Sequence, residues 1–282
     1  MPEPIAREVA AHYDELDLFY RRVWGEQIHH GLWLRGDESS EEAARGVANL
    51  VKERLGLKAG QRVCDVGCGY GRIAGEMAAA SGVRVMGLTL SSRQAEVARK
   101  RADPGVEVRA GNWLEWEIPE GSFDAVFAVE SLEHMERPGR AIAKMATALK
   151  PGGRMALCCW LLAPDMLGWE RRHLIGPIRE SGHLAGMSTG DDVIRWIRSA
   201  GLKLESVEDF SRQVERTWPL CLRRSLSGMI RDPELRRYFL RHGGRNFGFA
   251  LSLLRIWTAY LTGALRYQVF TATKPEASGL DP

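Results

Sequence analysis

Short apolar runs alternate with amphipathic stretches along most of this chain, and this alternation constrains the fold more than any other feature of the sequence. The runs of strand length are Arg62 to Val66, Val83 to Leu88, Val106 to Ala110, Phe123 to Val129, Met155 to Trp160, Leu202 to Phe210 and Arg266 to Thr273. The stretches with helical spacing are Arg72 to Ala80, Ser91 to Arg101, Arg140 to Leu149 and Asp191 to Ser199. Parallel strands need crossover connections, and right-handed crossovers place helices on both faces of a sheet. The sequence therefore predicts an α/β fold with a doubly wound sheet.

Mostly helical segments flank and interrupt this alternation. Residues 1–59 are expected to form a helical N-terminal arm, in which Ser39-Ser40-Glu41-Glu42 is a capping box for a helix that ends at Leu55. Residues 60–282 contain the sheet, and a mostly helical lid at about 211–265 separates the last two strand candidates. Because both ends of the lid lead into the same sheet, we expect the lid to belong to that domain.

The charge of the chain is distributed unevenly. A total of 39 Lys and Arg against 36 Asp and Glu gives a net charge of +3, too close to neutral for the whole surface to favour nucleic acid. The segment from Arg212 to Arg266, however, contains eleven arginines and three acidic residues. Such a row of arginines is typical of a solvated helix face. The alternative is that Arg223, Arg224, Arg236, Arg237 or Arg241 bind an anionic substrate group or make transient contact with an anionic membrane.

Cysteine usage and hydropathy favour a cytoplasmic protein without a metal site. The five cysteines are an odd number, and none lies in a Cys-x-x-Cys pair or beside histidines at zinc spacing. The N-terminus carries acidic residues and no apolar core, so it does not resemble a signal peptide. The segment from Phe247 to Leu265 is the only one apolar enough to resemble a membrane span. Because Arg255 lies at its middle, we expect a buried or interface helix there.

The most informative motif is Val63-Cys64-Asp65-Val66-Gly67-Cys68-Gly69-Tyr70-Gly71-Arg72. An apolar strand carries an acidic residue near its end, and glycines at every second position then lead into a helix. Such glycines adopt positive φ and let a ligand approach the backbone, and the helix start offers unpaired N–H groups. A dinucleotide fold has Gly-x-Gly-x-x-Gly and an acidic residue about twenty residues later. Because Gly71 is one residue early and Leu88-Thr89-Leu90 holds no acid, the motif disfavours NAD.

This segment resembles the first motif of class I S-adenosylmethionine-dependent methyltransferases. Further matches follow in the order of that family: Gly87-Leu88-Thr89-Leu90-Ser91 with Gln94, Gly111-Asn112-Trp113, Phe123-Asp124-Ala125-Val126, and Leu149-Lys150-Pro151-Gly152-Gly153. The resemblance implies a Rossmann-like, doubly wound sheet of seven strands and S-adenosylmethionine as the cofactor.

The resemblance also implies which residues bind the cofactor. In this family the motif glycines line its methionine end, the loop after the second strand meets the ribose, the loop after the third contacts adenine, and the end of the fourth reaches toward the sulfonium. The corresponding residues are Asp65, Gly67, Cys68, Gly69, Gly71, Thr89, Leu90, Gln94, Asn112, Trp113 and Glu130. Thr89 and Asn112 stand where many members have acidic residues. Gln94 is expected to replace the ribose contact, or to act as the capping-box partner of Ser91, and Asn112 keeps a carbonyl acceptor.

A closer resemblance is to gamma-tocopherol C-methyltransferases and their small-molecule relatives. It rests on Tyr13-Asp14, Trp24 to Trp33, Glu130 to Met135, Cys158-Cys159-Trp160, Trp218-Pro219 and Gly263 to Tyr267. Cyclopropane fatty acid synthases share part of this pattern, but they use a cysteine where Val129 and Ser131 stand here. The resemblance implies methyl transfer to carbon, nitrogen or oxygen of a small aromatic or prenylated acceptor in secondary metabolism. The alternatives are a lipid-acting, cyclopropane-synthase-like enzyme and a non-catalytic cofactor-binding scaffold.

Methyl transfer needs an aligned acceptor and a group that takes the proton which the acceptor loses. His134 is the first candidate, because an imidazole titrates near neutral pH, and the adjacent Glu133 is a second catalytic candidate. The alternative for His134 is that it caps the following turn or packs against the cofactor. His29 and His30 are adjacent, so in an extended segment only one side chain faces the pocket, and we favour His30. Its expected neighbours on the aromatic wall of the substrate site are Tyr20, Trp24 and Trp33. The identity of the acceptor and the oligomeric state stay open.

Overall fold

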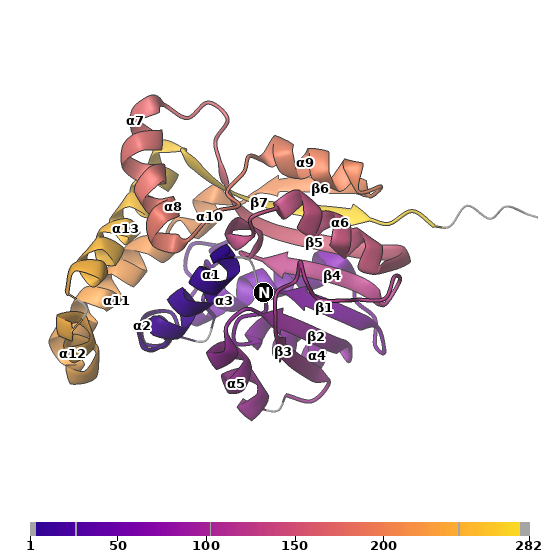
Figure 1. Cartoon of the computed structure of the whole chain (residues 1–282), viewed down its shortest axis with the longest axis horizontal. Helices are drawn as coiled ribbons and strands as arrows, with labels where there is room; N and C mark the ends of the chain where they lie inside the picture. Colours follow the sequence, from indigo (N-terminus) through magenta and orange to yellow (C-terminus); the bar gives the residue numbers. More distant parts are fainter. Residues whose placement is uncertain (1–3, 26, 102, 242, 277–282) are drawn as a thin grey trace, which may run out of the picture.

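The computed structural model describes residues 4–25, 27–101, 103–241 and 243–276, and a seven-stranded sheet runs through its middle (Figure 1). The strands are β1 (Arg62–Val66), β2 (Arg84–Thr89), β3 (Val106–Ala110), β4 (Phe123–Val129), β5 (Leu149–Leu162), β6 (Lys203–Asp209) and β7 (Leu265–Thr273). The longer helices are α1 (Pro4–Glu15), α3 (Ser40–Leu55), α4 (Arg72–Ser81), α5 (Ser92–Arg101), α6 (Pro138–Ala148), α9 (Gly190–Ser199), α11 (Thr217–Arg231), α12 (Pro233–Arg241) and α13 (Gly243–Thr262). Shorter helical segments are α2 (Asp17–Val23), η1 (Leu132–His134), α7 (Gly168–Glu170), η2 (Arg171–Ile175), α8 (Gly176–Gly182) and α10 (Ser211–Val214).

The strand order is β3-β2-β1-β4-β5-β7-β6. Strands β1 to β5 pair in parallel, whereas β7 lies antiparallel between β5 and β6. In an open sheet of this kind, ligands bind outside the carboxyl ends of the parallel strands where the strand order reverses, which here is between β1 and β4. This arrangement confirms the predicted Rossmann-like, doubly wound sheet of seven strands.

Both faces of the sheet are buried, because successive side chains of a strand point to opposite faces. Val63 of β1 and Phe127 of β4 belong to an apolar cluster that includes residues of α3 and α4. Cys64 and Val126, each one position away, belong to a second cluster with residues of α6 and α9. The two clusters fix the sheet between two layers of helices and hold its carboxyl-terminal edge in place.

Most boundaries agree with the sequence prediction, and the main difference is at the start of β5. The predicted strand began at Met155, but Leu149 already pairs with Phe123 of β4, and the pairing passes an irregularity before it resumes at Arg154. Pro151-Gly152-Gly153 broke the apolar pattern without ending the strand. At α3 the predicted capping box is present: Ser39 accepts from the Glu42 N–H, Glu42 accepts from the Ser39 N–H, and Gly56 ends the helix at φ +57°.

Helices α1 and α2 and the segment between β6 and β7 lie toward the carboxyl-terminal edge of the sheet (Figure 1), whereas α3 packs on α4 and β5. Helix α1 packs on α5, and α2 packs on α11. Helices α10 to α13 form an insertion between β6 and β7 (residues 211–262, hereafter the helical insertion), and Figure 1 shows α11, α12 and α13 together beside α8 at one end of the sheet. In the described part of the chain none of the helices, α13 included, has the length and hydropathy needed to cross a membrane.

Candidate active site

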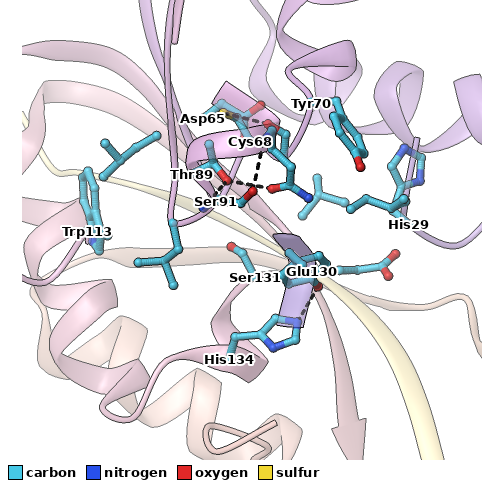
Figure 2. A pocket seen from close by; sticks show the side chains of 18 of the residues that line it. His29, Asp65, Cys68, Tyr70, Thr89, Ser91, Trp113, Glu130, Ser131 and His134 are labelled. Atoms are coloured by element: carbon cyan, nitrogen blue, oxygen red, sulfur yellow. Dashed lines mark hydrogen bonds between the residues drawn. The ribbon is translucent and has the colours of Figure 1, made fainter. Parts of the chain in front are cut away.

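The first cavity lies at the carboxyl ends of β1, β2, β3 and β4 and has about 930 Å³ of space between atoms, part of it open to solvent. Figure 2 shows Asp65, Cys68, Thr89 and Ser91 on one side of it and Ser131, Glu130 and His134 on the other, with Trp113 and His29 at opposite ends. The N-terminal segments add Val9, Tyr13, Gln27 and Ile28 to its lining.

The glycine turn after β1 leaves room for a ligand at one position in particular. Gly67 has φ +87°, and an added Cβ there would lie 2.3 Å from Cβ of Ser131, so this glycine is needed for packing. Gly69 has φ +53°, and an added Cβ would meet only Ile28, 3.9 Å away, so its open side faces the cavity. Gly71 does not line the cavity as predicted: at φ +70° it is the N-cap of α4 and supports the turn from behind.

One buried polar atom in the loop after β2 has no hydrogen-bond partner in the described part of the chain. Thr89 Oγ1 donates to Gln94 Oε1 at 2.8 Å, and the Gln94 backbone N–H donates to Ser91 Oγ at 3.0 Å. Gln94 Nε2 is buried and has no hydrogen-bond partner among the described residues. The Gln94 side chain is therefore not the capping-box partner of Ser91. Its free N–H groups suit a ribose hydroxyl.

The remaining cofactor residues line the same cavity. Burial raises the pKa of Asp65 to about 8, so this carboxyl gains from a cationic or hydrogen-bonding ligand group. Asn112 Oδ1 accepts from the Leu114 N–H at 3.0 Å, and Trp113 Nε1 donates to the Ala141 carbonyl at 3.2 Å, so both side chains are held in fixed positions. Leu90, Cys68 and Glu130 complete the set. The glycine turn, the unpartnered amide and the position of the cavity at the carboxyl ends of the strands together fit S-adenosylmethionine.

A second cavity of about 610 Å³ lies beside the first, beneath α8, α11 and α13. Its walls are mostly aromatic and aliphatic: Tyr20, Trp24, Trp160, Ile178, Leu184, Trp218, Leu253 and Ile256. Tyr20 and Trp24 thus lie where the sequence predicted a substrate wall. Trp33 does not: its ring is 7% exposed, its Nε1 donates to the Glu38 carbonyl, and it packs outside both cavities.

Five residues line both cavities and form the junction between them: Tyr13, Ile28, His29, Glu130 and His134. At this junction the Tyr13 hydroxyl and His134 Nε2 are 2.8 Å apart. His134 Nδ1 donates to the His183 carbonyl at 3.3 Å, which leaves Nε2 as the acceptor for the Tyr13 O–H. Burial lowers the pKa of His134 to about 4, so the imidazole is neutral at physiological pH. The Tyr13 hydroxyl therefore occupies the one ring nitrogen of His134 that could accept a proton, and both side chains line the two cavities.

Glu130 is the charged group of the junction. It has φ +51°, a conformation that non-glycine residues rarely adopt outside functional sites. Its carboxylate accepts from the His30 backbone N–H, from His30 Nδ1 and from the Tyr267 hydroxyl, at 2.8, 2.8 and 3.0 Å. Burial alone would raise the pKa of Glu130, but the electrostatic contact and hydrogen bonds of His30 outweigh it and hold the pKa below the ordinary value.

His30 lines the second cavity, but both of its ring nitrogens are occupied. Nδ1 donates to Glu130, and Nε2 accepts from Trp218 Nε1 at 3.0 Å. Because an indole N–H can only donate, Nε2 has no lone pair left for a proton from an acceptor. The prediction that His30 is a catalytic base is therefore corrected: it positions Glu130 and connects the arm to the helical insertion.

His29 and Glu133 also differ from expectation. The chain bends at His29, so this ring and His30 both line the second cavity, although an extended segment would present only one. Glu133 is 2% exposed, lines neither cavity, and accepts from the Trp160 backbone N–H. Its expected catalytic role is therefore replaced by a structural one, in which Glu133 of η1 fixes this turn to β5.

The structure bears on the two interpretations of the basic segment, a solvated helix face or the binding of an anionic group. Arg223, Arg224, Arg236 and Arg237 are exposed, and no lysine or arginine lines the second cavity among the residues that the structure describes. The side chain of Arg241 lies outside the described residues. No group of three or more His, Cys, Asp or Glu side chains in the described ranges is arranged to hold a metal ion.

Sequence reasoning missed Tyr13, His29, Trp160 and Trp218 as site residues. Tyr13 and His134 are 121 positions apart, and Trp218 and His30 are 188 apart. The only sequence signal was their place in segments that resemble the small-molecule methyltransferases.

The sheet order, the glycine turn and the paired cavities define a class I S-adenosylmethionine-dependent methyltransferase. Comparison with known proteins agrees. A model of the family described as mycolic acid cyclopropane synthetase matches residues 2–224. The chain is 34% identical over 283 residues to 27-O-demethylrifamycin SV methyltransferase of Amycolatopsis mediterranei (strain S699), with 98% of this chain and 100% of the relative covered.

Two further similarities span nearly the whole chain. It is 26% identical to a probable chloroplastic tocopherol O-methyltransferase of Oryza sativa subsp. japonica, with 98% of this chain and 80% of the relative covered. The crystal structure of mycolic acid cyclopropane synthase CmaA1 with SAH and CTAB has the same fold, with a TM-score of 0.87, 20% identity, and 97% and 99% of the two chains covered. The chain belongs to the mycolic acid cyclopropane synthetase family of S-adenosylmethionine-dependent methyltransferases, and the predicted likeness to tocopherol methyltransferases is confirmed.

Proposed function

We propose that the protein transfers a methyl group from S-adenosylmethionine in the first cavity to a hydroxyl group of a small, mostly aromatic or apolar acceptor in the second. The observation that carries this proposal is the junction, where five residues line both cavities. The cofactor, when bound, supplies an electrophilic methyl group on a cationic sulfur. The protein's own contribution is to align the acceptor, exclude water and accept a proton.

The walls of the second cavity support an apolar acceptor. Indole and phenol rings from the arm, from β5 and from the helical insertion surround it, and the described lining holds no lysine or arginine. The full-length relative at 34% identity is named for an O-demethyl compound, which agrees with a hydroxyl acceptor. We rank the lipid-acting alternative second, because the relatives of 30% identity or more that cover most of the chain are named as methyltransferases, among them the rifamycin enzyme.

Tyr13 and His134 are placed to move the proton of that hydroxyl. Burial raises the pKa of Tyr13, so its hydroxyl stays protonated and donates to His134 Nε2. Its oxygen keeps a lone pair for the acceptor's O–H. As the oxygen of the acceptor bonds to the methyl carbon and the sulfur–carbon bond breaks, that proton passes to Tyr13, and the proton of Tyr13 passes to His134.

Glu130 supports the same assignment through charge. Its ionised carboxylate places a negative charge between the cavities, in a surrounding of low polarity where electrostatic interactions are strong. This charge favours a cationic group in the first cavity and disfavours a carboxylate or phosphate in the second. An intact proton-accepting pair beside such a charge also argues against a non-catalytic scaffold.

The test uses radiolabelled S-adenosylmethionine with a defined library of phenols, hydroxyquinones and hydroxylated macrolactones. We expect acceptor-dependent label in the product, and a loss of about 10²-fold in kcat in both Tyr13→Phe and His134→Gln, because general acid–base catalysis contributes on this order. The exposed His173→Gln is the control and should behave as wild type. Tight cofactor binding without any labelled product from the library would instead support the scaffold.

We further propose a cytoplasmic location and transient contact of the helical insertion with an anionic membrane from which an apolar acceptor could be taken. The support is that exposed arginines share α11 with the exposed Leu226 and Ile230, which are 50% and 76% exposed. Co-sedimentation with phosphatidylserine vesicles, but not with phosphatidylcholine vesicles, is the expected result, and no sedimentation with either would refute it.

A further inference from the structure

Two buried polar atoms of residues that line the second cavity have no hydrogen-bond partner in the described part of the chain. They are His29 Nε2 and Trp160 Nε1. Buried polar groups in folded proteins are almost always paired, and an unpaired one costs stability. A pair of such atoms on one cavity points to a ligand that supplies both partners.

The chemistry of His29 Nε2 follows from its other ring nitrogen. Nδ1 is 2.7 Å from the His30 carbonyl oxygen, which can only accept, so Nδ1 carries the hydrogen. Nε2 then presents a lone pair. Burial lowers the pKa of His29, against the opposing effects of Glu130 and Glu76, and this keeps the ring neutral. His29 is therefore a hydrogen-bond acceptor at the junction.

Trp160 offers the opposite chemistry. Its indole N–H can only donate. The ring is held in place by neighbouring rings, with centroid distances of 5.2 Å to His30 and 5.7 Å to Trp218, and its backbone N–H is fixed to Glu133. Trp160 lines the second cavity and its Nε1 is buried without a partner in the described part of the chain, so its N–H is one donor left for a ligand group there.

We propose that His29 and Trp160 determine acceptor specificity: His29 binds a second hydroxyl or N–H group beside the methylated hydroxyl, and Trp160 binds an uncharged oxygen such as a carbonyl. This inference rests on the proposed function. Tyr13 receives the hydroxyl that is methylated, so the donor for His29 must be a different group. The oxygen for Trp160 is uncharged because Glu130 repels an anion and the described lining has no basic side chain except histidine. The acceptor class is a neutral aromatic or polyketide-like molecule with two neighbouring donors and a carbonyl.

The test uses small probes that orient freely in the cavity of the protein loaded with S-adenosylhomocysteine. Acetophenone is compared with ethylbenzene for Trp160, and catechol with phenol for His29, by titration of the indole N–H signals in nuclear magnetic resonance spectra. We expect the oxygen-bearing member of each pair to bind about tenfold more tightly to wild type, equal to about 1.4 kcal/mol. The indole N–H signal of Trp160 is identified by its loss in Trp160→Phe. Its chemical shift should change on addition of acetophenone and not on addition of ethylbenzene.

Each preference should vanish in one variant only. Trp160→Phe keeps the ring and should equalise acetophenone and ethylbenzene, whereas the exposed Trp169→Phe should change nothing. His29→Asn keeps a donor for the His30 carbonyl, removes Nε2, and should equalise catechol and phenol. Equal affinities in wild type, or preferences that survive in these variants, would overturn the proposal. So would a His29→Asn protein that loses affinity for S-adenosylhomocysteine and keeps the catechol preference, because the cofactor would then be the partner. If the probes behave as expected but no acceptor is methylated, the proposed function fails and this inference stands.

Discussion

Replacement of Glu133 by glutamine should make the protein more stable at neutral and mildly alkaline pH. Burial raises the pKa of Glu133 from 4.5 to about 8, so its carboxyl stays protonated in the folded protein at pH values where the unfolded chain has lost that proton. Unfolding therefore releases a proton between these pH values, and the free energy of unfolding falls as pH rises from about 4.5 to about 8. With 1.36 kcal/mol per pKa unit, the loss amounts to about 5 kcal/mol. The glutamine side chain is neutral throughout and can still accept from the Trp160 N–H.

The assay is urea unfolding followed by tryptophan fluorescence at a series of pH values between about 5 and about 8.5, with linear extrapolation of the free energy of unfolding. Glu133→Gln and wild type should be of similar stability at the acidic end, and the variant should gain steadily toward the alkaline end. Asp65 remains in both proteins and leaves a residual slope in each, because burial also raises its pKa to about 8. The exposed Glu136→Gln is the control and should run parallel to wild type. Parallel curves for Glu133→Gln would show that the carboxyl is ionised in the folded protein and would refute the reasoning.

Three other predictions concern ligand binding. Gly69→Val should abolish binding of S-adenosylhomocysteine in calorimetry, because the side chain would fill the open side of the turn at φ +53°; unchanged affinity would remove the cofactor from this site. Deletion of residues 1–31 should stop methyl transfer and weaken cofactor binding more than tenfold, because this segment contributes to the lining of the first cavity: Val9, Tyr13, Gln27, Ile28 and His29. If methyl transfer is lost while cofactor affinity is unchanged, the segment contributes to acceptor binding alone. Activity should survive excess chelator. A loss of activity that added zinc or magnesium restores would contradict the assignment of the histidines.

The sequence predicted the strands best where an apolar run is bounded by glycine, proline or charged residues. The limits of β1, β3 and β4 were predicted to the residue. β1 and β4 are buried along most of their length, whereas β3 is an edge strand in which Val108 alone is buried, so its limits were marked by Gly105 and Gly111. The start of β5 was missed because Pro151-Gly152-Gly153 has the composition of a loop, whereas pairing with β4 continues on both sides of it. Local composition describes the backbone preference of a segment and carries no information about its neighbour in the sheet.

The sequence predicted those parts of the site whose residues are close together in the chain. The cofactor loops follow their strands directly, so most residues from Asp65 to Glu130 were placed by spacing and resemblance. The histidines were harder, because the role of an imidazole depends on what bonds to its second nitrogen. Trp218 occupies Nε2 of His30, while Nε2 of His29 has no partner among the described residues, and the sequence shows two adjacent histidines without this difference.

The helical insertion between β6 and β7 is a segment that can change in sequence and length and thereby alter which acceptor is bound. Asp209 at the end of β6 pairs with Gln268 of β7, so the two ends of the helical insertion leave and re-enter the sheet on neighbouring strands. An insertion whose ends lie so close together can change in length or sequence at little cost in chain closure. Among the residues that the structure describes, its helices supply one wall of the second cavity and none of the lining of the first. Lineages, or protein engineers, could therefore exchange much of residues 211–262 to reach new acceptors, provided that Thr217 and Trp218 are kept, because their hydrogen bonds to Gly31 and His30 support the junction with the methyl-donor site.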